Sequence, residues 1–247
     1  MQELMQQLVR LYLPVGAPPP AEPGTADAVR EGGVRAIVIP FELKGEGDGA
    51  RQWERLCEVA NALQAELGLP APAVSVSGAT GFRLWLSFAQ PVPVDRAQRF
   101  LALLRAAYFS DAKLPEQGVR APLELPPRLH PATGKWAAFI HPGMGAAFAD
   151  EPALEIAPPA AAQAALLQDL RSITPAQLQQ ALDVLEREPV QPPSVQPPSV
   201  QPAPRSTPAV DGVPPDLLLK DATLEDIVRF LHANNIEPTF RHLIGRD

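Results

Sequence analysis

The residues with the clearest capacity for chemistry lie around a hairpin predicted at residues 74–95, VSVSGATGFRLWLSFAQPVPVD. Two apolar runs flank a Ser-Gly-Ala-Thr-Gly turn, and one arginine, Arg83, stands early in the second run. A guanidinium is permanently charged and binds phosphate through two parallel hydrogen bonds. Ser77, Thr80 and the backbone amides of the glycine turn can add donors. The pattern indicates an anion site, with phosphate as the first candidate ligand.

Trp85 follows Arg83 by two residues, so both side chains point to one face of a regular strand. An aromatic ring beside an arginine can stack on a nucleic-acid base. A tryptophan in such a strand is also commonly a core residue. The sequence leaves both interpretations open.

Acidic residues cluster after a different apolar run. Glu42, Glu46 and Asp48 lie in or beside the loop KGEGDG. Carboxylates are the ligands that Mg²⁺ and Mn²⁺ prefer, so these three residues are candidates for a metal site. The alternative is a solvated acidic turn. The sequence contains no GxxxxGK[ST], HExxH, CxxC or GxSxG motif, so no common catalytic signature selects a reaction.

A basic turn occurs at RLHPATGK, which contains Arg128, His130 and Lys135. It can hold a template phosphate, or it can simply connect two strands. Residues 83–135 contain eight Lys/Arg and four Asp/Glu, a net charge of +4, whereas the whole chain has a net charge of −7. A local basic surface on an acidic protein can attract a phosphate backbone. Helix-face arginines such as Arg96 and Arg99 are equally expected to be solvated.

Composition restricts the function classes. A pI of about 5.2 argues against binding of nucleic acid by bulk charge alone. The single cysteine, Cys57, excludes a disulfide within the chain. The N-terminus lacks the features of a signal peptide, and no apolar run reaches the length of a membrane span. We expect a cytoplasmic protein without membrane contact.

Hydrophobic periodicity predicts the elements that must position these residues. Helices are expected at 1–13, 49–67 and 96–109, and Asp95 is expected to cap the helix at 96–109. Two more helices are expected at the end of the body, and the last of them begins at the capping box TPAQ. Strands are expected at 34–43, 73–77, 82–88 and 136–142, with a short one at 121–125. The mixture of helices and strands, with one direct hairpin, favours an α+β fold with a partly antiparallel sheet.

Proline divides the chain. Residues 188–215 repeat the unit VQPPS, which forms neither helix nor sheet and is typical of an extended spacer, with a PxxP ligand as the alternative. We therefore expect a body at 1–188, a proline-rich linker at 189–213 and a short helical tail at 214–247. The amphipathic tail is too small to bury its own core, so it should dock on the body or on a protein partner. Its acidity disfavours a helix-turn-helix DNA reader.

Three stretches in order resemble the archaeo-eukaryotic primase superfamily, and are most similar to primase-polymerase domains of bacterial mobile-element and defence systems. They are RAIVIPFEL, then SGATGFRLWLSFAQPVPVDRAQRFLALL, then LELPPRLHPATGKWAAFIHP. In that family the second stretch runs Ser-Gly, small residues, then Gly-aromatic-His-hydrophobic-Trp, and the third ends in a turn of the type His-Pro-x-Thr-Gly-Lys. The resemblance covers roughly residues 34–142.

The departures from this family pattern concern its catalytic residues. The resemblance places Pro40 and Glu42 where the family has two aspartates, and Arg83 where it has a histidine that contacts the incoming nucleotide. Asp111 and Glu124 are the candidates for the third carboxylate. Two-metal nucleotidyl transfer needs converging carboxylates, and proline offers no ligand. The resemblance therefore implies a degenerate site, with Glu42 as the one candidate catalytic residue and Mg²⁺ or Mn²⁺ as cofactor only if activity survives.

Three hypotheses follow from the sequence. The first is a non-catalytic, primase-like accessory protein that binds nucleic acid or a nucleotide, as a single strand or primed template, and recruits a partner through its tail in replication, mobile-element maintenance or defence. The second is a divergent, metal-dependent nucleotidyltransferase that uses Glu42 with Glu46 or Asp48. The third is a protein–protein adaptor that has kept the fold alone, and the net acidity favours it.

Overall fold

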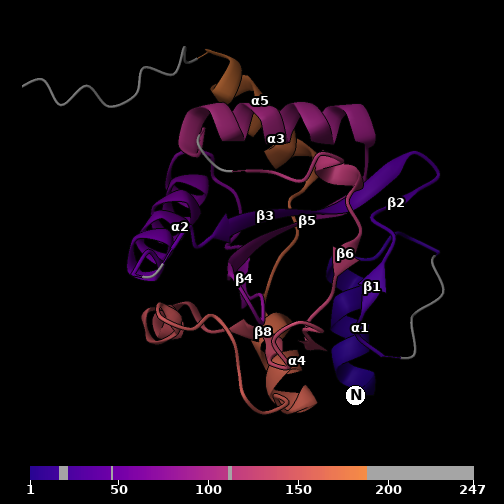
Figure 1. The fold of residues 1–247 in the computed structure, drawn as a ribbon. Coiled ribbons are helices and arrows are strands. Elements are labelled where there is room, and N and C mark those ends of the chain that lie inside the picture. The colour runs from indigo at the N-terminus through magenta and orange to yellow at the C-terminus, as the bar shows by residue number, and fades with distance from the viewer. Residues whose placement is uncertain (17–21, 46, 111–112, 188–247) are drawn as a thin grey trace, which may run out of the picture. The chain divides into compact units, whose positions relative to one another are not determined.

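Two long antiparallel strands, β3 (Gly33–Glu42) and β5 (Gly81–Pro93), form the centre of the molecule (Figure 1). The computed structural model describes residues 1–16, 22–45, 47–110 and 113–187. Shorter strands extend the sheet in the order β2-β3-β5-β4-β8-β7, and each pair is antiparallel. The added strands are β2 (Val29–Arg30), β4 (Ala73–Val76), β7 (Arg128–Leu129) and β8 (Trp136–Ile140). The predicted α+β fold with an antiparallel sheet is confirmed.

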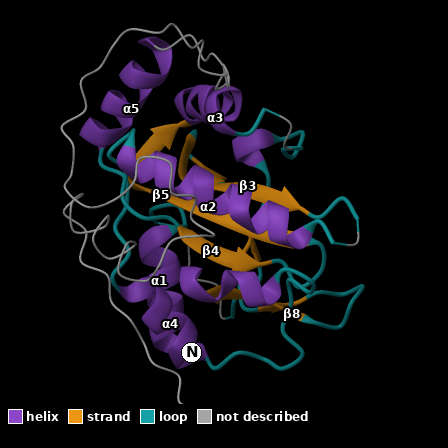
Figure 2. Cartoon of the chain, turned by 90° about the vertical axis from the view of Figure 1, so that its left-hand side faces the viewer, coloured by secondary structure: helices purple, strands orange, loops and turns teal. Residues whose placement is uncertain are grey.

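Helical crossovers connect strands that are not adjacent. Strands β3 and β4 both run antiparallel to β5, which lies between them, and helix α2 (Gly49–Ala65) connects them. Helix α3 (Val94–Tyr108) lies in the connection from β5 to β8. These two strands lie on either side of β4, and both run antiparallel to it. Together with α5 (Pro175–Arg187), these helices bury the apolar residues of one sheet face in the larger core cluster (Figure 2).

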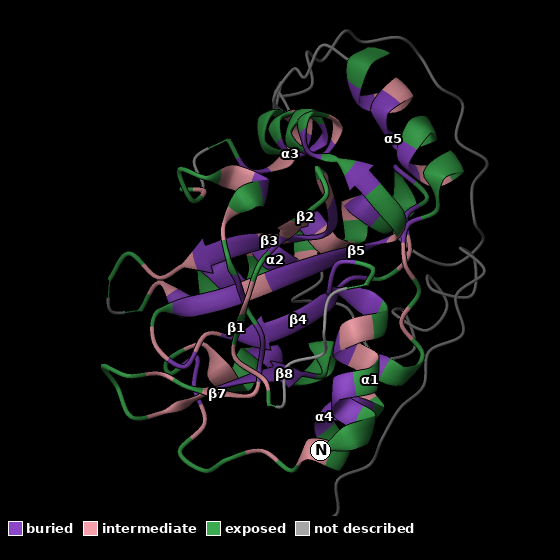
Figure 3. Ribbon diagram, turned by 90° about the vertical axis from the view of Figure 1, so that its right-hand side faces the viewer, coloured by how far each residue is buried: buried purple, intermediate pink, exposed green. Residues whose placement is uncertain are grey.

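Helices α1 (Gln2–Leu11) and α4 (Ala160–Gln168) cover part of the opposite face (Figure 3). Here Tyr12, Trp85 and Phe139 pack together, with ring centroids 5.0 Å apart for Tyr12 and Trp85 and 5.5 Å for Trp85 and Phe139. Such aromatic contacts bury large apolar areas. This part of the face is therefore closed by side chains.

Residues 113–128, called segment 113–128 below, lie over the rest of this face. The segment contains the 3-10 helix η1 (Gly118–Arg120), which contacts α3 and β3, and strand β6 (Leu123–Glu124). Strand β6 corresponds to the predicted short strand, but it pairs with β1 (Thr25–Ala26) rather than with the main sheet. The segment thus forms a separate layer opposite β3 and β5.

Local signals at the helix ends were predicted with mixed success. The capping box is confirmed, because Gln177 N donates to Thr174 Oγ1 at 3.2 Å and Thr174 N donates to Gln177 Oε1 at 3.0 Å. The predicted cap by Asp95 is wrong: Pro93 is the N-cap residue of α3, and no side chain caps it. Strand β5 runs directly into α3, so the helix begins earlier and Asp95 lies in its first turn.

Two further expectations concern the ends of the body. The linker at 189–213 and the tail at 214–247 lie outside the described residues. None of the helices within the described ranges is long and apolar enough to cross a membrane.

A second 3-10 helix, η2 (Pro142–Phe148), follows β8 and was not predicted.

A buried glutamine ties α4 to strand β8. Gln163 is 3% exposed; its Nε2 donates to the Phe139 carbonyl at 3.0 Å and its Oε1 accepts from the Phe139 amide at 2.7 Å. We expect Gln163→Ala to lower the free energy of unfolding by about 3 kcal/mol, because two buried backbone groups lose their partner. Urea denaturation measures this change. Gln168→Ala, at an exposed position of the same helix, is the matched control and should change stability by less than about 0.5 kcal/mol.

Candidate anion-binding site

A pocket of about 370 Å³ lies between segment 113–128 and the sheet face that carries Arg83. Cross-strand pairing fixes the position of this arginine, because Pro40 on β3 and Ser75 on β4 are its direct partners. Alternation along each strand brings every second side chain to this face. The pocket-lining residues on β3, β4 and β5 include Pro40, Glu42, Ser75, Arg83 and Trp85, and Ser77 lines it from the turn after β4.

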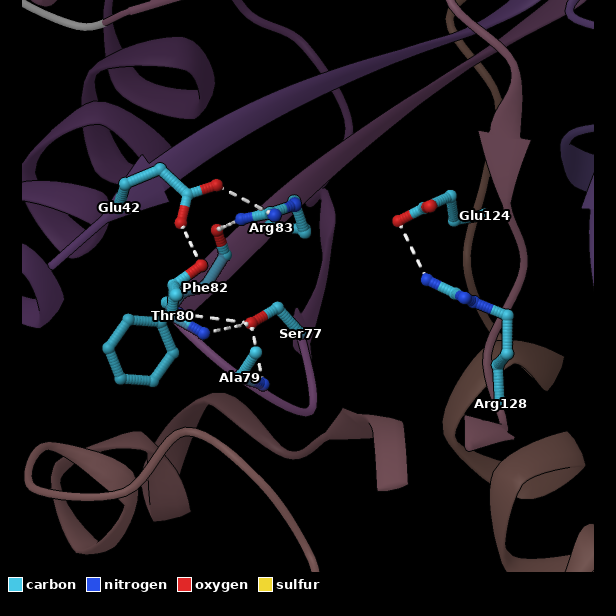
Figure 4. Close-up of polar contacts among 9 residues, drawn as sticks. Glu42, Ser77, Ala79, Thr80, Phe82, Arg83, Glu124 and Arg128 are labelled. Carbon is cyan, nitrogen blue, oxygen red and sulfur yellow. Dashed lines mark hydrogen bonds and ion pairs between the residues drawn. The ribbon is translucent and has the colours of Figure 1, made fainter. Parts of the chain in front are cut away.

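Arg83 and Glu42 form an ion pair at one side of the pocket (Figure 4). Arg83 Nη2 lies 2.7 Å from Glu42 Oε1, and Arg83 Nη1 donates to the Phe82 carbonyl at 3.0 Å. The second carboxylate oxygen of Glu42 accepts from Thr80 Oγ1 at 2.5 Å. Both oxygens of Glu42 therefore have a partner, and the guanidinium of Arg83 is held in one orientation.

Arg128 and Glu124 form a second ion pair on the opposite side (Figure 4). Arg128 Nη2 lies 2.8 Å from Glu124 Oε2. Within the described ranges, Arg128 Nε is buried and has no hydrogen-bond partner. Lys113 also lines the pocket, so three basic and two acidic side chains surround it among the described residues. The pocket therefore offers two guanidinium groups, one from the central strand β5 and one from the edge strand β7.

The glycine turn satisfies its own donors. Ser77 Oγ accepts hydrogen bonds from the backbone amides of Ala79, Thr80 and Gly81 at 3.2, 2.9 and 3.0 Å. This arrangement closes the tight hairpin turn in the way serine hydroxyls commonly do. The amides that the sequence offered as phosphate donors are thus engaged within the turn. Ser77 lines the pocket and supports the hairpin that carries Arg83.

The basic turn at 130–135 lies outside the pocket lining and packs against the hairpin turn. Thr133 Oγ1 donates to the Gly78 carbonyl at 2.6 Å. Lys135 forms ion pairs with Glu151 and, at 2.8 Å, with Glu155. The structure therefore brings Ser77, Arg83, Trp85 and Arg128 to one pocket, and leaves Thr80, His130 and Lys135 outside it.

Trp85 is a core side chain with one edge at the pocket. It is 2% exposed, and its Nε1 donates to Ser75 Oγ at 2.9 Å. Its ring packs on Tyr12 and Phe139, as described above. Base stacking by Trp85 stays a prediction, and the burial favours the core interpretation that the sequence left open.

The carboxylates proposed as metal ligands are directed to different partners. Asp48 accepts from the Lys44 amide at 2.9 Å, from Arg51 Nε at 2.9 Å and from Gln52 Nε2 at 3.1 Å. The hydrogen bond from the Lys44 backbone, followed by those from the other donors and the Arg51 charge, lowers the pKa of Asp48. Asp48 thus organises the start of α2, whereas Glu42 binds Arg83.

The remaining acidic candidates do not complete a metal site in the described ranges. Glu46 and Asp111 lie outside the described residues. Glu124 pairs with Arg128, across the pocket from Glu42. Within those ranges, no group of three or more His, Cys, Asp or Glu residues could hold a metal ion.

Sequence reasoning missed the wall of the pocket. It named Arg128 as a phosphate-binding candidate in the basic turn, Glu124 as a candidate carboxylate and Lys113 only as part of the basic stretch, and it did not bring the three to one pocket, although all of them line it. The available signal was the basic stretch 83–135, which includes Lys113 and Arg128. Their convergence with Arg83 depends on how segment 113–128 lies over the sheet, which periodicity does not encode.

A comparison with solved structures shows distant similarity to a viral domain. No protein-family model matches the chain, and a search of curated proteins finds no match. Among solved structures, the AEP domain of the cyanophage S-2L primase-polymerase (PrimPol) is similar with a TM-score of 0.32 and 18% sequence identity. The match covers 55% of this chain and 60% of that domain. A similarity at this level says nothing about the residues of the site.

The Glu42–Arg83 pair should contribute little to stability. The two side chains are 38% and 21% exposed, and partly exposed ion pairs are commonly worth less than about 1 kcal/mol. We expect Glu42→Gln to change the free energy of unfolding by less than about 1 kcal/mol. Urea denaturation measures this, and Glu124→Gln is the matched control on the opposite wall. A loss of several kcal/mol would mean that the pair is a structural element rather than part of a binding site.

Proposed function

We propose that the chain is a non-catalytic binding protein for a nucleoside phosphate, either a nucleotide or the end of a single nucleic-acid strand. The observation that carries this proposal is the pair of guanidinium groups, Arg83 and Arg128, on opposite walls of one pocket. Arginine binds phosphate through a planar fork of donors, so two arginines can hold a phosphate from both sides.

Size and lining support this ligand class. Small-molecule pockets typically have volumes from about 300 Å³ upward, with mostly apolar walls and a few fixed polar groups. The pocket of about 370 Å³ suits a ligand of the size of one nucleotide. Its apolar lining, which can contact a base or sugar, includes Ile37, Val38, Trp85, Leu101, Leu114, Val119 and Leu123.

The arrangement of carboxylates supports binding without nucleotidyl transfer. Two-metal catalysis requires carboxylates that converge on the ions holding the attacking and leaving oxygens. Glu42 is engaged by Arg83 and Thr80. Two residues earlier on the same strand, and therefore on the same face of the sheet, lies Pro40, whose side chain has no atom that can bind a metal. Metal-dependent activity with Mg²⁺ or Mn²⁺ through Glu42 is the alternative, and the binding assays below include both ions.

The remaining parts of the proposal concern residues outside the described ranges. We infer recruitment of a protein partner through residues 214–247, on the strength of the amphipathic pattern in that sequence. A role in replication, mobile-element maintenance or defence follows from the resemblance in the sequence alone. Neither inference depends on the geometry of the pocket.

Substitution of Arg83 tests ligand binding. We expect Arg83→Ala to weaken binding of a fluorescent nucleotide and of labelled single-stranded DNA or RNA by at least about tenfold, because a charge-assisted contact to phosphate is lost. Fluorescence anisotropy measures this at low and moderate salt, with and without Mg²⁺ or Mn²⁺. Arg99→Ala is the matched control: Arg99 lies on α3, pairs with Glu186 at 3.0 Å and is absent from the pocket lining. Equal affinity of wild type and Arg83→Ala would overturn the proposal.

Glu42 competes with an anionic ligand for Arg83. A phosphate that binds this guanidinium must replace the carboxylate or bind beside it, and like charges repel. We expect Glu42→Gln to raise the affinity for the same nucleotide by about threefold or more. The same anisotropy titration measures this gain. Weaker binding by Glu42→Gln would instead point to a ligand cation held by the carboxylate, as in the metal-dependent alternative.

A further inference from the structure

Thr80 holds the Glu42 carboxylate through the oxygen that does not face Arg83 (Figure 4). Its Oγ1 donates to Glu42 Oε2 at 2.5 Å, while Glu42 Oε1 lies 2.7 Å from Arg83 Nη2. Thr80 is exposed in the hairpin turn and is not among the residues that line the pocket. Its hydroxyl therefore reaches the pocket through Glu42.

Backbone contacts fix the position of this hydroxyl. The Thr80 amide donates to Ser77 Oγ at 2.9 Å, and the Thr80 carbonyl accepts from the Leu43 amide at 2.7 Å. The two strands also approach closely here, because a Cβ atom on Gly81 would lie 2.1 Å from the Phe41 carbonyl oxygen. Thr80 is thus tied to the turn on one side and to the end of β3 on the other, and its hydroxyl is preorganised beside the carboxylate.

A ligand must break two contacts of Glu42 to reach Arg83. The two carboxylate oxygens belong to one rigid planar group, so turning Oε1 away from the guanidinium also takes Oε2 away from Thr80. Hydrogen bonds to a carboxylate are stronger than those between neutral groups. The apparent affinity of a ligand falls with the fraction of molecules in which its binding group is available. The hydrogen bond from Thr80 therefore weakens every ligand that needs Arg83.

We propose that Thr80 is a positioning residue that keeps Glu42 on Arg83 as an internal competitor, so that the pocket rejects simple anions. This inference rests on the proposed function, because it takes Arg83 as the contact for the ligand's phosphate. An anion without further contacts exchanges one carboxylate for one phosphate and loses the hydrogen bond from Thr80. A ligand that also fills the apolar part of the pocket has additional binding free energy with which to displace Glu42. A cost built against unwanted ligands is a general source of specificity.

Substitution of Thr80 by valine tests the inference, because valine keeps the shape of the side chain and removes its hydroxyl. The full chain is titrated by isothermal calorimetry with a nucleoside monophosphate, and inorganic phosphate is added as a competitor. We expect Thr80→Val to raise the affinity for both by the same factor, about fivefold, because the hydroxyl changes only the fraction of molecules with an available Arg83 guanidinium. Thr80→Ser keeps the hydroxyl and should stay within about twofold of wild type.

Two controls show whether the effect passes through Glu42. In the Glu42→Ala background, Thr80→Val should change the affinity by less than about 1.5-fold, because the carboxylate that Thr80 holds is gone. Thr133→Val removes a hydroxyl that donates to the Gly78 carbonyl at 2.6 Å in the same turn, outside the pocket lining, and should leave the affinity unchanged. A general loosening of the turn would weaken binding, whereas the inference predicts a gain.

The outcomes separate this inference from the proposed function. If Thr80→Val leaves the affinity unchanged or lowers it, in a protein whose binding is lost in Arg83→Ala, the inference is overturned and the proposed function stands. A gain of equal size in the Glu42→Ala background also overturns the inference, because Thr80 would then act by another route. If wild type and the Thr80 variants bind neither probe, or if Arg83→Ala binds as wild type does, the inference and the proposed function are both overturned.

Discussion

The pocket depends on one electrostatic requirement: a guanidinium that projects from a sheet face near the start of β5 must find acceptors there. Arg83 meets it through Glu42 on the neighbouring strand and the Phe82 carbonyl. The antiparallel pairing of β3 with β5 sets Pro40 opposite Arg83 and Glu42 opposite Gly81, which brings the carboxylate within reach. A charged, partly exposed face cannot be closed by apolar helices at this point, because an unpaired or fully buried charge is costly. The pocket is the consequence of that requirement.

Helices α1 and α4 and segment 113–128 cover different parts of the sheet face that carries Arg83. Helices α1 and α4 cover the part of the face around Trp85 and Phe139, where the side chains are apolar. Segment 113–128 covers the part around Arg83, and it does so with ion pairs and short apolar contacts rather than with a helix. The pocket lies where the apolar part of the face around Trp85 meets segment 113–128.

Elements with strong periodicity were predictable from the sequence, and the site was predictable only in part. The β4–β5 hairpin, helix α2 and the capping box of α5 follow from alternation, a helical stripe and Thr174 with Gln177. Arg83 was identified because a lone charge in an apolar strand is unusual. The closure of the turn by Ser77 is local, and it was missed because the hydroxyl was assigned to a ligand. The convergence of Arg128 with Arg83 and the ion pairs of Lys135 depend on contacts between segments far apart in sequence. Local propensity does not encode those contacts.

The most direct test of the account is a crystal structure of the chain grown with a nucleoside triphosphate. The account predicts phosphate density bound to the guanidinium groups of Arg83 and Arg128, with the Glu42 carboxylate turned away from Arg83. The account would be contradicted by an empty pocket with an intact Glu42–Arg83 pair, if the nucleotide at saturating concentration is bound elsewhere or absent.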